Sequence, residues 1–187
     1  MTSATDTRLD QLTGDYTIDP SHTRIGFQAR HAMVTKVRGS FKDFEGSFHL
    51  DPANPEASSA SVTIQAKSID TGNEQRDAHL RSNDFFAMDQ HPQIRFVSSS
   101  VDQVDERHFV LNGELTVRGI TRPVSVDFEF YGAEIDPWGN SRIGFEGSTE
   151  INRKDWGVNW NAALDSGGVL VSDKVKLEFD VSATKNA

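Results

Sequence analysis

Histidine and carboxylate side chains are the groups of this chain that could bind a metal ion or exchange protons with a substrate. The six histidines are dispersed along the sequence, at His22, His31, His49, His79, His91 and His108. No two have the spacing that places metal ligands on one face of a helix, and His91 precedes Pro92, which favours extended backbone. Distant His and Asp side chains could still meet on neighbouring strands, but dispersed surface histidines are the commoner case. The sequence therefore predicts no metal site.

The patterns of known catalytic sites are also missing. The chain has no cysteine, which excludes disulfides, thiolate catalysis and cysteine-bound zinc or iron–sulfur centres. There is no nucleophile elbow, Walker loop, dinucleotide-binding glycine motif or zinc-protease helix. The stretch 165–168 (Asp-Ser-Gly-Gly) is similar to part of a chymotrypsin-like nucleophile segment, but Leu164 stands where a glycine is expected and no histidine has a matching context. We interpret this stretch as a turn and predict no catalytic residue.

The charge balance limits the kinds of partner. Asp and Glu number 28 against 19 Lys and Arg, which gives a formal net charge of −9. Long-range repulsion opposes nucleic acid, and an anionic membrane surface, as the main partner. No stretch approaches the roughly 18 apolar residues of a membrane span, and residues 1–12 lack the basic start and apolar region of a secretion signal. We expect no nucleic-acid partner, no stable membrane insertion and a cytoplasmic location.

The elements that would position a site follow a period of two. In seven segments between Ile25 and Val181, apolar residues alternate with polar ones, as in an antiparallel sheet with one wet face. Turn sequences such as Arg118-Gly119 separate these segments. Seven or eight such strands must close into a barrel or stack as a sandwich. We favour an all-β barrel, because glycines within the strand patterns leave interior space or permit tight curvature.

Four regions depart from this alternation. Residues 1–13 are polar and aperiodic, so we expect a disordered tail before a single domain over 14–187. Phe41 and Phe44 fall on opposite phases, which indicates a bulge or bend near Asp43. The stretch 71–74 (Thr-Gly-Asn-Glu) fits a capping box that would begin a short surface helix over 74–82. The irregular stretch 155–173, which carries exposed-looking aromatic residues, is typical of a functional loop.

Phenylalanine is the dominant aromatic residue. The chain has twelve Phe against two Tyr and three Trp, and a ring without a polar tip suits a dry interior. A well-filled core is the simplest explanation. Because no catalytic set is visible, the sequence also has the profile of a barrel that binds an apolar ligand.

Short motifs follow one another in order between Asp15 and Val181. The most specific is a Ser-Ile-Asp-Thr stretch at 68–71 followed by Arg-Asp-Ala-His-Leu-Arg-Ser-Asn-Asp-Phe-Phe at 76–86. Others are Tyr-Thr-Ile-Asp at 16–19, His-Thr-Arg-Ile-Gly-Phe at 22–27, Val-Arg-Gly-Ser-Phe at 37–41 and Arg-Lys-Asp-Trp-Gly at 153–157. Together they resemble the YceI-like family, whose members are lipocalin-like barrels described as polyisoprenoid-binding proteins. Tyr16, Thr23 and Trp156 stand where that family commonly has Trp, Ser and Phe.

The resemblance implies an extended eight-stranded antiparallel lipocalin-like barrel, with one or two short helices, around a long isoprenoid chain, an isoprenoid quinone or a similar lipid. We expect aromatic residues inside the barrel and near its entrance to line the cavity: Phe27, Phe41, Phe85, Phe86, Phe96, Phe128, Phe130, Phe145, Trp156, Trp160 and Phe179. For each Phe, simple core packing is an equally good interpretation. An anionic head group would need cationic side chains at the mouth, for which the candidates are Arg30, His31 and Arg153.

Three functions stay open at this stage. We favour a non-enzymatic carrier that sequesters an isoprenoid lipid, with no cofactor other than that ligand. An enzyme acting on a small apolar substrate inside the barrel is the alternative that His22 or His31 beside a carboxylate in the cavity would favour. The third is a structural or stress-response module with a filled barrel, against which an open apolar cavity would argue. The oligomeric state is also open, and a homodimer is one option.

Overall fold

The computed structural model describes residues 12–162, 164 and 170–186. Its strands, in chain order, are β1 (Gly14–Ile18), β2 (Arg24–His31), β3 (Thr35–Phe41), β4 (Phe44–Leu50), β5 (Ser59–Gln65), β6 (Ile69–Asp70), β7 (Gln93–Gln103), β8 (His108–Val117), β9 (Ile120–Ile135), β10 (Ser141–Asn152) and β11 (Val171–Lys185). The helices are α1 (Glu74–Arg81) and the short 3₁₀ turns η2 (Pro55–Ala57), η3 (Ala66–Ser68) and η4 (Arg153–Trp156). In this described part of the chain, no helix has the length and apolar character needed to cross a membrane.

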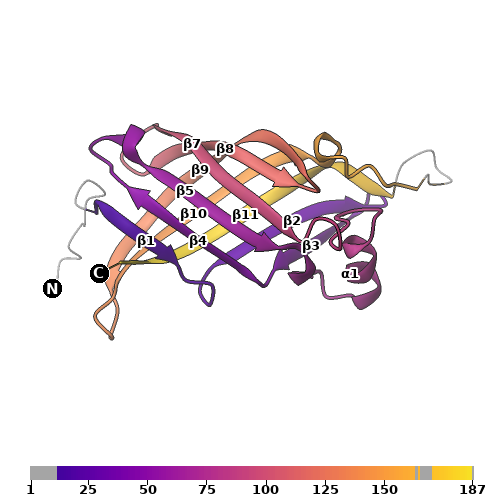
Figure 1. Cartoon of the computed structure of the whole chain (residues 1–187), viewed down its shortest axis with the longest axis horizontal. Helices are drawn as coiled ribbons and strands as arrows, with labels where there is room; N and C mark the ends of the chain where they lie inside the picture. Colours follow the sequence, from indigo (N-terminus) through magenta and orange to yellow (C-terminus); the bar gives the residue numbers. More distant parts are fainter. Residues whose placement is uncertain (1–11, 163, 165–169, 187) are drawn as a thin grey trace.

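The strands form one antiparallel sheet that closes on itself (Figure 1). Their hydrogen-bonded order is β1-β4-β5-β7-β8-β9-β10-β11-β2-β3-β6, and β1 also pairs with β11. The long strand β11 pairs with β2 over most of its length and with β1 at its C-terminal end. β1 and β2 are therefore two halves of one barrel strand, and so are β3 with β4 and β5 with β6. The result is the closed eight-stranded barrel that the sequence predicts.

A sharp bend separates β3 from β4. β3 ends at Phe41 and β4 begins at Phe44, with the bend at Lys42 between them. Both Phe rings are buried, so the change of phase keeps the apolar side inward on both strands. The predicted bend near Asp43 is confirmed, and it allows β4 to pair with β1 and β5 while β3 stays beside β2.

The β8–β9 hairpin shows how the alternating pattern becomes an inner wall. Leu111 lies opposite Val126, and Phe109 lies opposite Phe128, on the inward face of the two strands. The strands are joined by Arg118 and Gly119, which have φ values of 53° and 74°. A two-residue connection with positive φ at both positions matches the right-handed twist of a hairpin. The predicted turn at Arg118-Gly119 is therefore confirmed.

Helix α1 starts at Glu74, as predicted, but its cap differs from the predicted one. The Asn73 side chain accepts a hydrogen bond from the Arg76 backbone N–H at 2.9 Å. The Thr71 hydroxyl instead donates to the buried Asp77 carboxylate. The predicted capping box of Thr71 and Glu74 is wrong because Asp77 takes up the hydroxyl that the box requires. The helix ends at Arg81, with Ser82 as its C-cap.

The two ends of the barrel differ. Figure 1 shows α1 at one end, near β2 and β3, and β1 at the other. We call the end that carries α1, η4 and the β2–β3 turn the α1 end, and the opposite one the β1 end. Leu12 packs at the β1 end, where its carbonyl accepts a hydrogen bond from the Tyr16 hydroxyl at 2.9 Å. The expected tail over 1–13 thus includes a packed residue at position 12, while residues 1–11 lie outside the described residues.

Candidate ligand cavity

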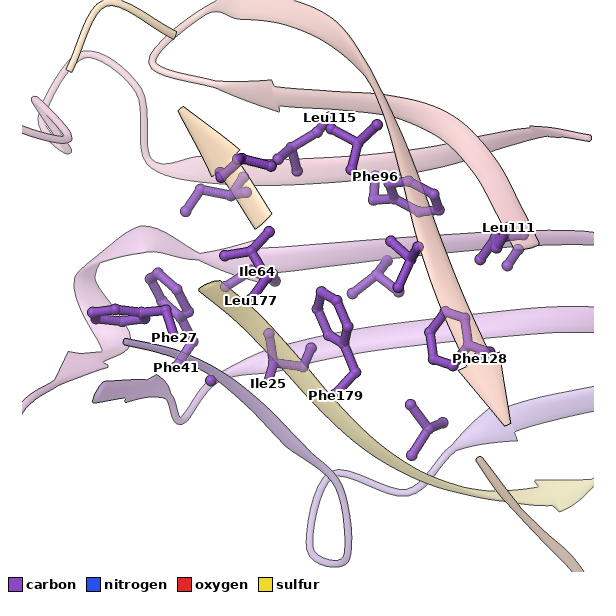
Figure 2. Close-up of a pocket in the computed structure, with 18 of the residues that line it drawn as sticks. Ile25, Phe27, Phe41, Ile64, Phe96, Leu111, Leu115, Phe128, Leu177 and Phe179 are labelled. Atoms are coloured by element: carbon purple, nitrogen blue, oxygen red, sulfur yellow. The ribbon is translucent and has the colours of Figure 1, made fainter. Parts of the chain in front are cut away.

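An apolar cavity of about 320 Å³ lies inside the barrel. Side chains from every strand line it, and almost no polar atom faces it. Figure 2 shows ten labelled side chains around this space, all of them hydrocarbon. The volume is at the lower end of the range for small-molecule sites. Because the described barrel keeps open apolar space, the structure argues against a module filled by its own side chains.

Glycines in the strands give the wall its width. Three aromatic rings each cover a glycine on a neighbouring strand, and a Cβ added at that glycine would overlap the ring: Phe27 over Gly39, Phe96 over Gly113, and Phe128 over Gly147. A ring that covers a glycine occupies the space of the missing side chain and projects less far into the lumen. The glycines on the apolar phase therefore leave interior space, as the sequence indicates.

Aromatic side chains pack at the α1 end of the cavity. Phe86, which follows α1, contacts the ring of Phe41 edge-on at 6.0 Å between centroids. Trp156 in η4 is 3% exposed, and its Nε1–H donates to the Leu115 carbonyl at 2.8 Å. This hydrogen bond satisfies the polar tip of a buried indole and fixes the ring against β8. The aromatic residue that looked exposed in sequence is thus part of the wall.

Trp160 lies outside the cavity, contrary to expectation. Its ring packs against Phe85, at 5.4 Å between centroids, and against His79, at 4.6 Å. Phe85 lines the cavity, and Trp160 packs against Phe85 without lining the cavity itself. The chain reverses at Gly157, whose φ of 72° is left-handed, and Trp160 follows that reversal. The predicted turn at 165–168 lies outside the described residues.

Phe130 also differs from its predicted role. It faces inward and is 4% exposed, but it belongs to a second packed cluster at the β1 end, with Leu12, Tyr16, Ile143, Phe145 and Ala183. In that cluster Tyr16 stacks on Phe48 at 5.1 Å, and burial raises the pKa of the Tyr16 hydroxyl. β9 is long enough that its later residues have passed beyond the open space, so inward direction alone does not place Phe130 on the cavity wall.

Arg153 lines the cavity, but its guanidinium group is engaged by backbone carbonyls. Nη1 donates to Val158 at 2.7 Å and Trp160 at 2.8 Å, and Nε donates to Ser172 at 2.9 Å. Burial lowers the pKa of Arg153, and the nearby Asp173 partly offsets that effect. Arg153 therefore ties the loop after η4 to the start of β11, and little of its donor capacity is left for a head group.

The other two head-group candidates lie away from the cavity wall. Arg30 and His31 are exposed at the end of β2 and do not line the cavity. The structure therefore does not gather Arg30, His31 and Arg153 into one site. Arg30 points outward because it falls on the polar phase of β2, opposite to Ile25 and Phe27.

Neither His22 nor His31, the two histidines that would favour an enzyme if they lay beside a carboxylate in the cavity, is among the residues that line it. His22 is 65% exposed at its side chain and bonds through Nδ1 to Asp19 Oδ2 at 2.8 Å on the outer surface. Ser21 Oγ contacts the same Nδ1, so the Ser–His–Asp grouping lacks the relay through Nε2 that a triad uses. Among the described residues, no three His, Asp or Glu side chains lie close enough to share a metal ion.

Nine of the eleven predicted aromatic residues line the cavity: Phe27, Phe41, Phe85, Phe86, Phe96, Phe128, Phe145, Trp156 and Phe179. Sequence reasoning missed the aliphatic share of the wall, which includes Ile25, Ile64, Ile94, Leu111, Leu115, Val124, Val126 and Leu177. The signal for these residues was present, because most of them lie on the same apolar phase as the aromatic ones.

Comparison with known proteins supports the same fold. The YceI-like domain model matches residues 16–183. A UPF0312 protein of Ectopseudomonas mendocina is 41% identical over 149 residues, covering 79% of this chain and 78% of that relative. The UPF0312 protein SAS2572 of Staphylococcus aureus is 39% identical over 165 residues, covering 88% and 94%.

Solved structures agree with this assignment. The crystal structure of Burkholderia cenocepacia BcnA has a TM-score of 0.79 and 25% identity, covering 89% of this chain and 99% of that one. A Campylobacter jejuni YCEI protein has a TM-score of 0.72 and 28% identity, covering 84% and 90%. A polyisoprenoid binding domain from Saccharophagus degradans shares the fold, with a TM-score of 0.68 at 14% identity over 91% and 98%. The chain belongs to the YceI-like family.

Proposed function

We propose that this protein binds and carries an isoprenoid lipid, with the hydrocarbon chain of the lipid inside the barrel. The observation that carries the proposal is the apolar cavity, whose wall draws on every strand and presents almost no polar atom. A hydrocarbon ligand suits such a wall, because a polar ligand would lose its hydrogen bonds to water without replacement. The polyisoprenoid-binding description of the Saccharophagus degradans domain, which has the same fold, favours this ligand class over other apolar molecules.

The free energy gained by burying two or three isoprene units is of the same size as the cost of association. Removing a methylene group from water contributes about 0.8 kcal/mol, so one five-carbon isoprene unit contributes about 4 kcal/mol. Two or three buried units then contribute about 8–12 kcal/mol, against association costs of about 4–15 kcal/mol. Chain length therefore decides whether a ligand is retained.

A polar head group would have to stay at the rim of the barrel. The cavity wall offers no free cation among the described residues, since Arg153 already donates to backbone carbonyls. The proposal therefore predicts that affinity depends on the apolar chain of the lipid and little on its head group. Polyprenyl alcohols, polyprenyl phosphates and isoprenoid quinones of equal chain length should bind with similar affinity.

Native mass spectrometry tests the proposal directly. The protein is purified without detergent, and its mass is compared before and after extraction with organic solvent, while the extract is analysed for isoprenoids. Extracted protein is then titrated with a polyprenyl alcohol and an isoprenoid quinone. Retention or binding of either class supports the proposal. The proposal is contradicted if the purified protein carries no lipid and the extracted protein binds neither compound.

Two valine substitutions supply a matched pair. Val126 is 4% exposed and lines the cavity, whereas Val97 is 47% exposed on the outer side of β7. Val126→Phe should place a ring in open space and lower isoprenoid affinity at least tenfold. Val97→Phe adds the same atoms outside the barrel and should leave affinity unchanged. Equal affinity in both variants would show that the ligand does not occupy the cavity.

A further inference from the structure

The β2–β3 hairpin carries a cluster of cations without acidic partners. Arg30 lies directly opposite Lys36 across the two strands, and Arg38 lies opposite Gln28. Arg30, Lys36 and Arg38 are all exposed, and in the described part of the chain their charged groups have no ion pair or hydrogen bond. Like charges directly opposite on a sheet are destabilising. We call these three residues the hairpin cations.

Some cations elsewhere on the barrel are paired with acids. Arg142 bonds to Asp19 and Asp136, each at 2.8 Å. Arg24, at the other end of β2, approaches Glu178 at 3.3 Å. In a chain with a net charge of −9, the three hairpin cations stand out because they lie together on one strand pair.

The turn that joins β2 to β3 adds exposed apolar side chains. Met33 is 59% exposed and Val34 is 75% exposed. Ala32 and Met33 have φ values of 51° and 64°, a conformation that L-residues other than glycine seldom adopt. The hairpin thus ends in an apolar tip, with Arg30 and Lys36 immediately behind it.

We propose that this hairpin docks the protein on the surface of an anionic lipid bilayer. Met33 and Val34 enter the boundary between head groups and acyl chains, and the hairpin cations contact lipid phosphates. Apolar tips flanked by Lys and Arg fit this interface, and each cation strengthens binding to anionic lipid. Nucleic acid would match the cations but leave the apolar tip unused.

The negative net charge of the protein is compatible with such docking. The Debye length is about 8 Å at physiological ionic strength, so acids on distant faces of the barrel are screened at the contact. The same acids repel other orientations. The hairpin lies at the α1 end, near α1 in Figure 1, so docking brings Phe86 and Trp156 toward the bilayer. Docking does not depend on the identity of the cargo, and lipid-free protein can test it.

The first test measures co-sedimentation with vesicles. Extracted protein is mixed with vesicles of phosphatidylcholine alone or with phosphatidylglycerol at three parts in ten. We expect binding to the anionic vesicles only, and its loss when the salt concentration is raised severalfold. Arg30→Gln/Lys36→Gln should weaken binding about 25-fold, at about fivefold per cation. Arg95→Gln/Lys185→Gln removes two exposed cations elsewhere, gives the same net charge and should keep most of the binding.

The second test identifies the docking surface. Because the chain has no cysteine, Val34→Cys and Ile135→Cys each provide a single site for a polarity-sensitive dye. Ile135 is 74% exposed at the β1 end and serves as the control. The dye at position 34 should shift to shorter wavelength with anionic vesicles, and the dye at 135 should not. The proposal is overturned if the protein does not bind the vesicles, or if both double variants lose vesicle binding equally. It is also overturned if only the dye at position 135 shifts its emission. Hairpin-dependent binding of single-stranded RNA without vesicle binding would likewise contradict it.

Discussion

The ring of Phe128 covers Gly147 on the adjacent strand. The two residues are register partners in the β9–β10 pair, and a Cβ on Gly147 would lie 2.5 Å from the ring atom Cδ1. Real Cβ atoms do not approach so closely, so any larger residue at 147 must displace the ring. The same Cβ would also lie 3.0 Å from the backbone oxygen of Asp127, so the side chain of Phe128 has to give way, and this ring borders the open space of the cavity. Cavity width thus depends on a residue that has no side chain.

Gly147→Ala should therefore narrow the cavity. We expect a loss of about 1–3 kcal/mol in the free energy of unfolding from the forced shift of Phe128, together with weaker isoprenoid binding. Urea denaturation and ligand titration measure the two effects. Gly144→Ala on the same strand is the control, because its Cβ would meet nothing closer than 3.9 Å. Equal behaviour of the two variants would contradict the role assigned to Gly147.

Phe128 and Phe130 should respond differently to truncation. Phe128 borders the cavity, whereas Phe130 is packed in the cluster at the β1 end. Phe130→Ala should cost about 3–5 kcal/mol, the usual range for a packed core Phe. Phe128→Ala should cost less in ligand-free protein, and should shift the chain lengths of retained lipids, because it enlarges an existing space. A full core-sized loss at Phe128, with no lipid retained by wild type or variant, would favour a filled interior.

Arg153 should matter for stability more than for ligand binding. Arg153→Met keeps the apolar stem but leaves the carbonyls of Val158, Trp160 and Ser172 without their donor, so we expect a loss of about 3 kcal/mol or more. Arg153→Lys should also be destabilised, since one ammonium group cannot replace a planar fork. Arg122→Met, at an exposed arginine, should cost under about 1 kcal/mol in the same thermal or urea assay.

Stability should fall in acid through Asp19. Hydrogen bonds from Ser21, Arg142 and His22 hold the pKa of the Asp19 carboxyl well below its usual range. As the pH drops below about 4, the unfolded chain binds a proton at this residue and the folded protein does not, so the contribution of Asp19 is present above that pH and is lost below it. In Asp19→Asn the free energy of unfolding should fall less between pH 5 and pH 2 than in the wild type, because the contribution of the ionised Asp19 is absent from the start. Asp89→Asn, at an exposed aspartate, should leave the curve unchanged.

Local pattern determined which residues could face inward. A period of two needs only neighbouring residues, so the sequence was sufficient for the strands, for the turn at Arg118-Gly119 and for the bend near Asp43. The resemblance of the ordered motifs to the YceI-like family then predicted that eight strands close into a barrel. A helix over 74–82 was predicted as well, one residue longer than α1. Its cap was not predicted, because a linear motif does not show that Asn73 caps the helix while Asp77 accepts the Thr71 hydroxyl.

Only the tertiary structure decided which inward residues border the cavity. Phe128 and Phe130 have the same phase on one strand, yet Phe128 meets open space, whereas Phe130 packs in a cluster with Tyr16 from β1 and Ile143 from β10. Position along the barrel axis depends on strand register and tilt, which a period of two does not contain. The same reason separates Arg153 from Arg30: their charges are equal, but backbone carbonyls from two segments surround Arg153, and the outward face of β2 leaves Arg30 in water.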